Sequence, residues 1–235
     1  MQEIIRIDLI GVNCYLGKQD GNFILFDTGG HLIFDKKFDN RAEALLKQLS
    51  ENGCTPENLK LIVLTHGDND HVANASALRK KFGAKIAMHE GDRALVENPD
   101  IDTVMQSFTF HSPVYRFAML FMKKQIRKIT VKTLDSYERF TPDIFLSDGE
   151  HLNEYGFNAQ ILHLPGHTPG SIAILTENGD LIIGDTLANS KKPEIAQIAN
   201  DFKLLKLSIE KIKCQNIKTV FPGHGKPFNI DELKL

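Results

Sequence analysis

The chain has 235 residues, of which 42% are hydrophobic and 25% charged, the balance of an ordinary water-soluble globular protein. A chain of this length can bury a sizeable core without disulfides, and we expect one domain over residues 1–235. The formal net charge of −2, from 28 basic and 30 acidic side chains, argues against a general nucleic-acid-binding protein, whose domain would be strongly basic.

The first ninety residues alternate between strand and helix patterns. Apolar runs, either alternating with polar residues or continuous and short, predict strands at residues 4–10, 12–17, 23–26, 61–64 and 84–89. Apolar residues spaced by three or four predict helices at residues 41–49 and 72–82. The strand at 23–26 ends in the turn Asp27-Thr28-Gly29-Gly30, and Gly83 stops the second helix.

Residues 99–141 interrupt this alternation, and we expect a helical insert there. Aromatic side chains stand beside a basic cluster; they are Phe108, Phe110, Tyr115, Phe117 and Phe121, followed by Lys123, Lys124, Arg127, Lys128 and Lys132. The insert is interpreted either as a lid, whose aromatic residues form an apolar wall, or as a surface helix with one apolar face. In the lid interpretation Lys123, Lys124, Arg127 and Lys128 bind an anionic group of the substrate. Attachment to a membrane surface is a third interpretation of the short basic pattern.

Strand patterns resume after the insert. We expect strands at 158–163, 171–176, 180–183 and 218–221, and a helix at 202–212. Asn178-Gly179 is the favoured pair for a tight hairpin turn between two of these strands. Strand-rich halves with interspersed helices predict an α/β fold in which two sheets pack together and the helices lie outside.

The cysteines and the N-terminus indicate a cytoplasmic protein. Cys14, Cys54 and Cys214 lie far apart and form no C-x-x-C pair, so we expect reduced, mostly buried thiols, as in a reducing cytosol. The charged residues among the first ten do not fit a signal peptide. The longest apolar run, residues 117–122, falls far short of the ~20 residues that span a bilayer.

The segment after the strand at 61–64 concentrates potential metal ligands. It offers four of them within six residues, namely His66, Asp68, Asp70 and His71. Imidazole and carboxylate together suit zinc, iron or manganese. No cysteine stands near, and a structural zinc site usually recruits cysteine. The segment therefore indicates an open, catalytic metal site.

Three further candidate ligands follow strand patterns in the same way. They are His167 in Pro165-Gly166-His167-Thr168, Asp185 in Gly184-Asp185-Thr186, and His224 in Pro222-Gly223-His224-Gly225. Each stands in a turn rich in glycine or proline, where a rigid strand carries a functional side chain at its end. Glycine permits the unusual backbone that aims such a side chain inward.

These motifs, in this order, resemble those of the metallo-β-lactamase superfamily, and the resemblance extends from Asp27 to His224. It implies a four-layer αββα sandwich with a helical insert and two divalent metal ions, zinc, manganese or iron. One ion would bind His66, Asp68 and His167, and the other Asp70, His71 and His224. Asp185 would bridge the two ions, and Asp27, in the early D-T-G turn, would support the site.

One position departs from the family's pattern. Most members have a second histidine where this chain has Asp68, although DNA-uptake competence proteins carry a similar H-x-D-x-D-H motif. Asp68 is either a ligand or a residue that only solvates the loop. As a ligand, it would join Asp70 and Asp185 to give a ligand charge of −3, which two divalent ions and one hydroxide would bring to zero (−3 + 4 − 1). The added carboxylate favours manganese or iron over zinc.

The resemblance implies a hydrolase in which a metal-bound hydroxide attacks the substrate and Asp70 also orients that nucleophile. The P-G-H-T and G-D-T-L segments are most similar to the glyoxalase II branch, so a small ester, thioester or lactone is the expected substrate. Phosphodiesterase or nuclease activity, an iron-dependent oxidation and a non-catalytic ligand-binding role remain alternatives, and nucleic acid is the least favoured partner. His31 and His89 are further candidates to contact the substrate.

Overall fold

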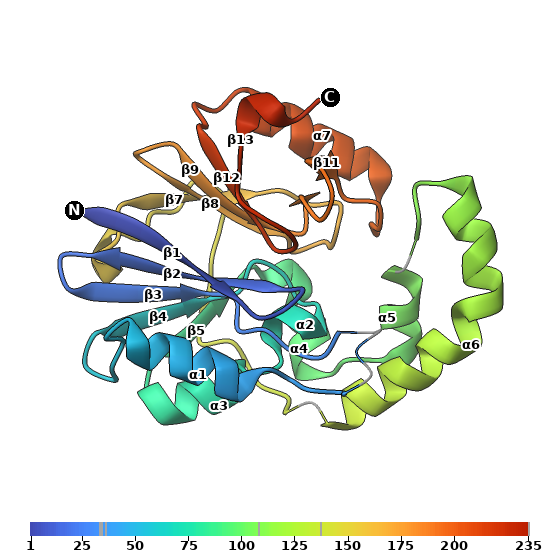
Figure 1. Cartoon of the computed structure of the whole chain (residues 1–235), viewed down its shortest axis with the longest axis horizontal. Helices are drawn as coiled ribbons and strands as arrows, with labels where there is room; N and C mark the ends of the chain where they lie inside the picture. Colours follow the sequence, from blue (N-terminus) through green and yellow to red (C-terminus); the bar gives the residue numbers. More distant parts are fainter. Residues whose placement is uncertain (33–34, 36, 108, 137, 235) are drawn as a thin grey trace.

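The computed structural model describes residues 1–32, 35, 37–107, 109–136 and 138–234. Two large β-sheets lie face to face, and helices cover their outer sides (Figure 1). The first sheet has the strand order β1-β2-β3-β4-β5-β6, antiparallel from β1 to β3 and parallel from β3 to β6. Its strands are β1 (Gln2–Asp8), β2 (Asn13–Gln19), β3 (Asn22–Phe26), β4 (Leu59–Val63), β5 (Lys85–Met88) and β6 (Ile144–Phe145).

The second sheet has the order β13-β12-β9-β8-β7. Its strands are β7 (Ala159–His163), β8 (Ile172–Thr176), β9 (Asp180–Gly184), β12 (Thr219–Pro222) and β13 (Phe228–Asn229). Strands β7 and β9 are both antiparallel to β8, and β12 is parallel to β9. Consequently β7, β9 and β12 run in the same direction. A separate antiparallel pair joins β10 (Leu187–Ala188) to β11 (Glu194–Ile195).

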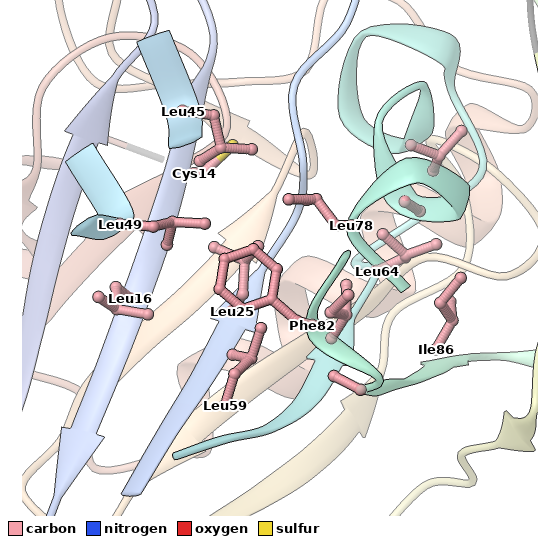
Figure 2. Packing of buried hydrophobic residues seen from close by; sticks show 14 of the residues in the cluster. Cys14, Leu16, Leu25, Leu45, Leu49, Leu59, Leu64, Leu78, Phe82 and Ile86 are labelled. Carbon is pink, nitrogen blue, oxygen red and sulfur yellow. The ribbon is translucent and has the colours of Figure 1, made fainter. Parts of the chain in front are cut away.

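The central strands β3 and β4 of the first sheet are largely apolar on both faces, and each face is covered. Ile24 and Phe26 face the second sheet, in a core shared with Ile174 of β8. Leu25 and Ile62, in the alternate positions of their strands, face the helices. Figure 2 shows this outer core, where Leu45 and Leu49 of one helix and Leu78 and Phe82 of another lie over the sheet. Each fully buried side chain of this kind contributes roughly 1.5–3 kcal/mol.

The outer helices complete the four layers. Helices α1 (Ala42–Glu51) and α3 (Ala75–Phe82) cover the first sheet, and α7 (Phe202–Lys213) covers the second. Asp201 caps α7, since its side chain accepts hydrogen bonds from the backbone N–H groups of Lys203 and Leu204. The expected αββα sandwich is therefore confirmed. The connections contain the short 3-10 helices η1 (Glu90–Asp92), η2 (Asn153–Tyr155) and η3 (Ile230–Glu232).

The helix predicted at 72–82 is wrong in its extent. The segment forms two helices, α2 (Asn69–Val72) and α3, separated at residues 73–74. The side chain of Asn74 donates to the carbonyls of Thr28 and Asn40, and this tertiary contact fixes the chain at the break. An additional helix, α4 (Arg93–Glu97), stands where the sequence suggested no element.

The insert consists of α5 (Ile101–Ser107) and the long α6 (Pro113–Ser136). Figure 1 shows the two as an arm at the side of the sandwich, apart from the outer helices.

Within the described residues, no helix has both the length and the apolar character needed to cross a membrane. The three cysteines are free thiols, and Cys214 is exposed rather than buried like Cys14 and Cys54.

Candidate metal centre

The candidate ligands gather at one edge of the sandwich because every turn that carries them follows the carboxyl end of a strand. The segment from His66 to His71 follows β4, and His167 follows β7. Asp185 follows β9, and His224 follows β12. Since β7, β9 and β12 run in the same direction, their carboxyl ends meet at a single edge. The backbone N–H of Ile172 donates to the carbonyl of Thr65 and so joins the two sheets there.

The first predicted ligand group comes together. Asp68 Oδ2 lies 3.1 Å from His167 Nε2 and 3.7 Å from His66 Nε2. His66, His167 and Asp185 each place one donor atom within 4.8 Å of the others. The Asp68 carboxylate therefore lies beside both imidazoles of its group, where a ligand to a shared ion would stand.

The second group also comes together, with Asp185 between the two. Asp70, His71 and His224 present donor atoms within 4.8 Å of one another. Asp70 Oδ2 lies 3.3 Å from His224 Nε2. Asp185 Oδ1 lies 3.3 Å from His71 Nε2, and its Oδ2 lies 3.1 Å from His224 Nε2 and 3.9 Å from His167 Nε2. This carboxylate thus faces both groups.

Each of the four imidazoles is oriented through Nδ1, which leaves Nε2 toward the centre. His71 Nδ1 lies 2.9 Å from Asp27 Oδ2, and His66 Nδ1 lies 3.0 Å from Thr65 Oγ1. His167 Nδ1 donates to the backbone carbonyl of Ile198 at 2.9 Å. His224 Nδ1 donates to the backbone carbonyl of Gly11. Metal-binding histidines are held in this way by their second nitrogen.

Several inward-facing atoms have no hydrogen-bond partner in the described part of the chain. They are Nε2 of His66, Nε2 of His71 and Oδ1 of Asp185, all buried. A buried polar atom without a partner costs free energy, so such atoms need another partner. The donor set of imidazole nitrogens and carboxylate oxygens is the one that zinc, iron and manganese accept. The residues therefore fit a metal centre.

The carboxylates give the centre an excess of negative charge. Burial alone would lower the pKa of His167, but its hydrogen bond to Asp68 and the charge of Asp68 raise that pKa to about 9. Burial likewise opposes protonation of His71 and His224, yet Asp185 and Asp70 hold both pKa values well above the usual range. The carboxylates therefore favour positive charge at these three imidazoles, as expected where cations bind.

Asp92 is a functional candidate that the sequence analysis missed. Its side chain is fully buried between the two ligand loops. Oδ2 accepts from the backbone N–H of Gly67 at 2.8 Å and from Thr168 Oγ1 at 2.6 Å, and Oδ1 accepts from the N–H of Gly170 at 2.6 Å. Burial raises the pKa of this carboxyl to about 6, although the three donors oppose the shift. Asp92 therefore ties the loop of His66 to the loop of His167.

Replacement of Asp92 by asparagine should loosen both loops. The amide keeps the size of the side chain but turns an N–H group toward a donor, so one buried hydrogen bond is lost. We expect the free energy of unfolding to fall by about 1–3 kcal/mol and metal affinity to fall about tenfold. Calorimetric metal titration and chemical denaturation measure the two. Asp143→Asn is the control, because Asp143 accepts from the N–H of Ile86 away from the centre. Equal metal affinity in the two variants would contradict the role of Asp92.

The centre opens into a cavity of about 680 Å³. His31 lines it and stacks on Phe38, with ring centroids 3.9 Å apart. His89 is not among the lining residues and stacks on His163 instead, at 3.8 Å. Of the two histidines proposed to contact the substrate, only His31 lines the cavity.

The part of the cavity wall that the insert forms differs from the aromatic and basic wall expected from the sequence. Thr130, Thr133 and Leu134 of α6 line it. Phe117 and Phe121 lie exposed on α6 and pack against each other, with ring centroids 5.2 Å apart. Lys123 and Lys124 are exposed, Arg127 forms an ion pair with Asp102, and none of the three is a lining residue. Among the residues expected for a lid, Phe108 lies outside the described residues and the side chain of Tyr115 is not described.

Comparisons with known proteins agree with this arrangement. Residues 7–224 match the family model of the metallo-beta-lactamase superfamily. The chain is 28% identical to the hydroxyacylglutathione hydrolase GloC of Haemophilus influenzae, over 99% of this chain and 94% of that protein. It is 26% identical to the probable metallo-hydrolase YqgX of Bacillus subtilis, over 92% of this chain and 86% of that protein.

Solved structures share the fold over nearly the whole chain. The BLEG-1 B3 metallo-beta-lactamase aligns with a TM-score of 0.67 at 23% identity, over 99% of this chain and 95% of that one. TTHA1623, in a di-iron-bound form, aligns with a TM-score of 0.64 at 22% identity, over 97% and 95%. The sandwich, the order of the ligand-bearing turns and the family match show together that this chain belongs to the metallo-β-lactamase superfamily.

Proposed function

We propose that this chain is a metal-dependent hydrolase that uses two divalent ions to cleave a small ester, thioester or lactone. The convergence of seven side chains with nitrogen and oxygen donor atoms from separate turns, five of which line one cavity, carries the proposal. The relatives named as a hydroxyacylglutathione hydrolase and a probable metallo-hydrolase support it. The expected ligands are His66, Asp68, Asp70, His71, His167, Asp185 and His224.

Two divalent ions held by these seven residues would supply a hydroxide nucleophile at neutral pH and Lewis acidity toward a substrate carbonyl. The protein's own part is to place the reactants. Asp70 lines the cavity and faces His224, so its carboxylate can accept a hydrogen bond from the attacking water and hold it in line. His31, on the cavity wall, is positioned to hydrogen-bond the substrate. Three carboxylates among the seven ligands favour manganese or iron over zinc.

Metal analysis combined with an activity panel tests the proposal. Protein loaded with manganese, iron or zinc is assayed against thioester, lactone and phosphodiester model substrates. We expect two ions per chain, hydrolysis of the thioester or lactone, and loss of activity on chelation. At a free metal concentration of 100 Kd, mass action gives about 2.7 kcal/mol of stabilisation, so chelation should lower Tm by roughly 5–10 °C.

A control variant tests whether a histidine outside the candidate centre contributes to metal binding or activity. His151 is exposed and is not in any of the metal-ligating groups found among the described residues, so His151→Ala should keep two ions and the wild-type activity. Fewer than one ion per chain, or two ions without hydrolysis of any substrate in the panel, would overturn the proposal.

A further inference from the structure

The cavity beside the metal centre has a largely apolar wall. Away from the candidate ligands, aliphatic side chains from several elements line it, namely Leu32, Leu95, Val104, Leu134, Ile195 and Ile198. The volume of about 680 Å³ lies within the range of pockets that enclose a whole small molecule. A ligand that reaches from the centre along this wall would bury apolar surface.

The charged groups on this wall do not offer a cation to a ligand. Apart from the histidines, Arg41 is the basic residue among the described lining residues, and it is 8% exposed. Its guanidinium forms an ion pair with Asp35 at 2.8 Å and donates to the carbonyls of Leu9 and Gly30. Glu194 adds a negative charge to the wall. A ligand carboxylate buried here would therefore lack a positive partner, which is costly.

One polar group that the insert presents to the cavity, the hydroxyl of Thr130, is also occupied. Thr130 and Thr133 are 6% and 7% exposed. The hydroxyl of Thr130 donates to the carbonyl of Ile126, in its own helix, at 3.0 Å. The basic residues Lys123 and Lys124 of the same helix are exposed and do not line the cavity. The insert thus contributes packing surface rather than charge.

We propose that this cavity binds an uncharged, apolar acyl chain, and that the scissile ester, thioester or lactone carbonyl of that chain lies at the metal centre. The inference rests on the proposed function and names its substrate class. Leu134 of α6 and Leu95 of α4 contact the chain, and the leaving group remains toward solvent. An acyl group that ends in a carboxylate is excluded, because neither Asp35 nor Glu194 can pair with it.

Hydrolysis of p-nitrophenyl esters from acetate to octanoate by the metal-loaded protein tests this inference. Each added methylene that enters the cavity should raise kcat/KM roughly two- to fourfold, the effect of burying one CH₂ group. A chain of matched length that ends in a carboxylate should react at least tenfold more slowly than its uncharged counterpart.

A charge placed in the wall should reverse this preference. Leu134→Lys should flatten the dependence on chain length and favour the chain that ends in a carboxylate. Val131→Lys is the matched control on the same helix, because Val131 is 41% exposed and does not line the cavity. It should retain the wild-type dependence on chain length.

Binding of 2-alkanones, which carry a carbonyl but no leaving group, keeps the inference testable without turnover. Their Kd, measured by ligand-observed NMR, should fall two- to fourfold per methylene in the wild type and not in Leu134→Lys. If the acetate ester is hydrolysed but the Kd of the alkanones does not depend on chain length, the inference is overturned and the proposed function stands. Chain-dependent binding without hydrolysis of any ester would overturn the proposed function and, with it, the substrate class, and would leave only an apolar binding cavity.

Discussion

Replacing Asp27 by alanine should weaken metal binding in both ligand groups at once. The buried carboxylate accepts from Thr65 N at 2.7 Å, from Thr65 Oγ1 at 2.8 Å and from His71 Nδ1 at 2.9 Å. Thr65 Oγ1 in turn contacts His66 Nδ1, so one side chain orients an imidazole in each group. We expect metal affinity to fall 10- to 100-fold, as for other residues that orient metal ligands.

The same substitution should also destabilise the fold. It leaves the N–H of Thr65 and the Nδ1–H of His71 buried without an acceptor, at roughly 1–3 kcal/mol each. We therefore expect the free energy of unfolding to fall by about 3 kcal/mol and Tm by about 6–12 °C, measured by calorimetry on the metal-free protein. Metal titration of the same samples gives the change in affinity.

Asp20 provides a matched control for the backbone. Both aspartates have a left-handed conformation, with φ of 60° at Asp27 and 51° at Asp20, so alanine introduces similar strain at both positions. Asp20 is exposed and pairs with the N-terminal amine. Asp20→Ala should keep wild-type metal affinity. If Asp27→Ala bound metal as tightly as Asp20→Ala, the role of Asp27 in orienting the imidazoles would be refuted.

The longer strands could be predicted because their apolar residues either alternate with polar ones or form short continuous runs. Residues 23–26 and 61–64 are apolar throughout, and the structure buries both faces of β3 and β4. The two-residue strands β6, β10, β11 and β13 gave no such pattern. Too short to have a periodicity, they depend on contacts with distant segments, as where Asn189 N–H, just after β10, donates to the carbonyl of His224.

The helix predicted at 72–82 shows why tertiary contacts override a local pattern. Apolar spacing continues across residues 73–74, and nothing in the segment itself marks a break. The break arises because Asn74 donates to the carbonyls of Thr28 and Asn40, which belong to a loop more than thirty residues away. A pattern that describes one face of a helix carries no information about such a partner.

The sequence was sufficient to name the candidate ligands that the structure brings together, whereas it did not reveal most of the groups that orient them. A histidine or aspartate in a glycine-rich turn carries its own ligand atom, so its residue type is the signal. The groups that orient His167 and His224 are the carbonyls of Ile198 and Gly11, and every residue has a carbonyl. Asp92 was not identified from the sequence for a related reason, since two of its three hydrogen-bond partners are backbone N–H groups.

Substitution of Asp68 by alanine should leave one tightly bound ion in place of two. Asp68 Oδ2 lies 3.1 Å from His167 Nε2 and 3.7 Å from His66 Nε2, so its loss removes the carboxylate shared by the first group. We expect kcat/KM to fall at least 100-fold, because a two-ion site loses one of its ions. Elemental analysis gives the stoichiometry, and the thioester and lactone assays give the rate. Asn69→Ala, in the same loop, should keep two ions.

Asp68→His keeps a ligand at position 68 but removes its negative charge, so it tests the effect of that charge alone. Histidine restores a donor but changes the ligand charge from −3 to −2, since Asp70 and Asp185 then remain as the two carboxylates. This variant should bind two ions and shift its preference from manganese or iron toward zinc, measured by competition between the metals. Asp68→Ala with two ions and full activity would mean that Asp68 only solvates the loop. The carboxylate would then have no part in selecting the metal, although it lies beside both imidazoles of the first group.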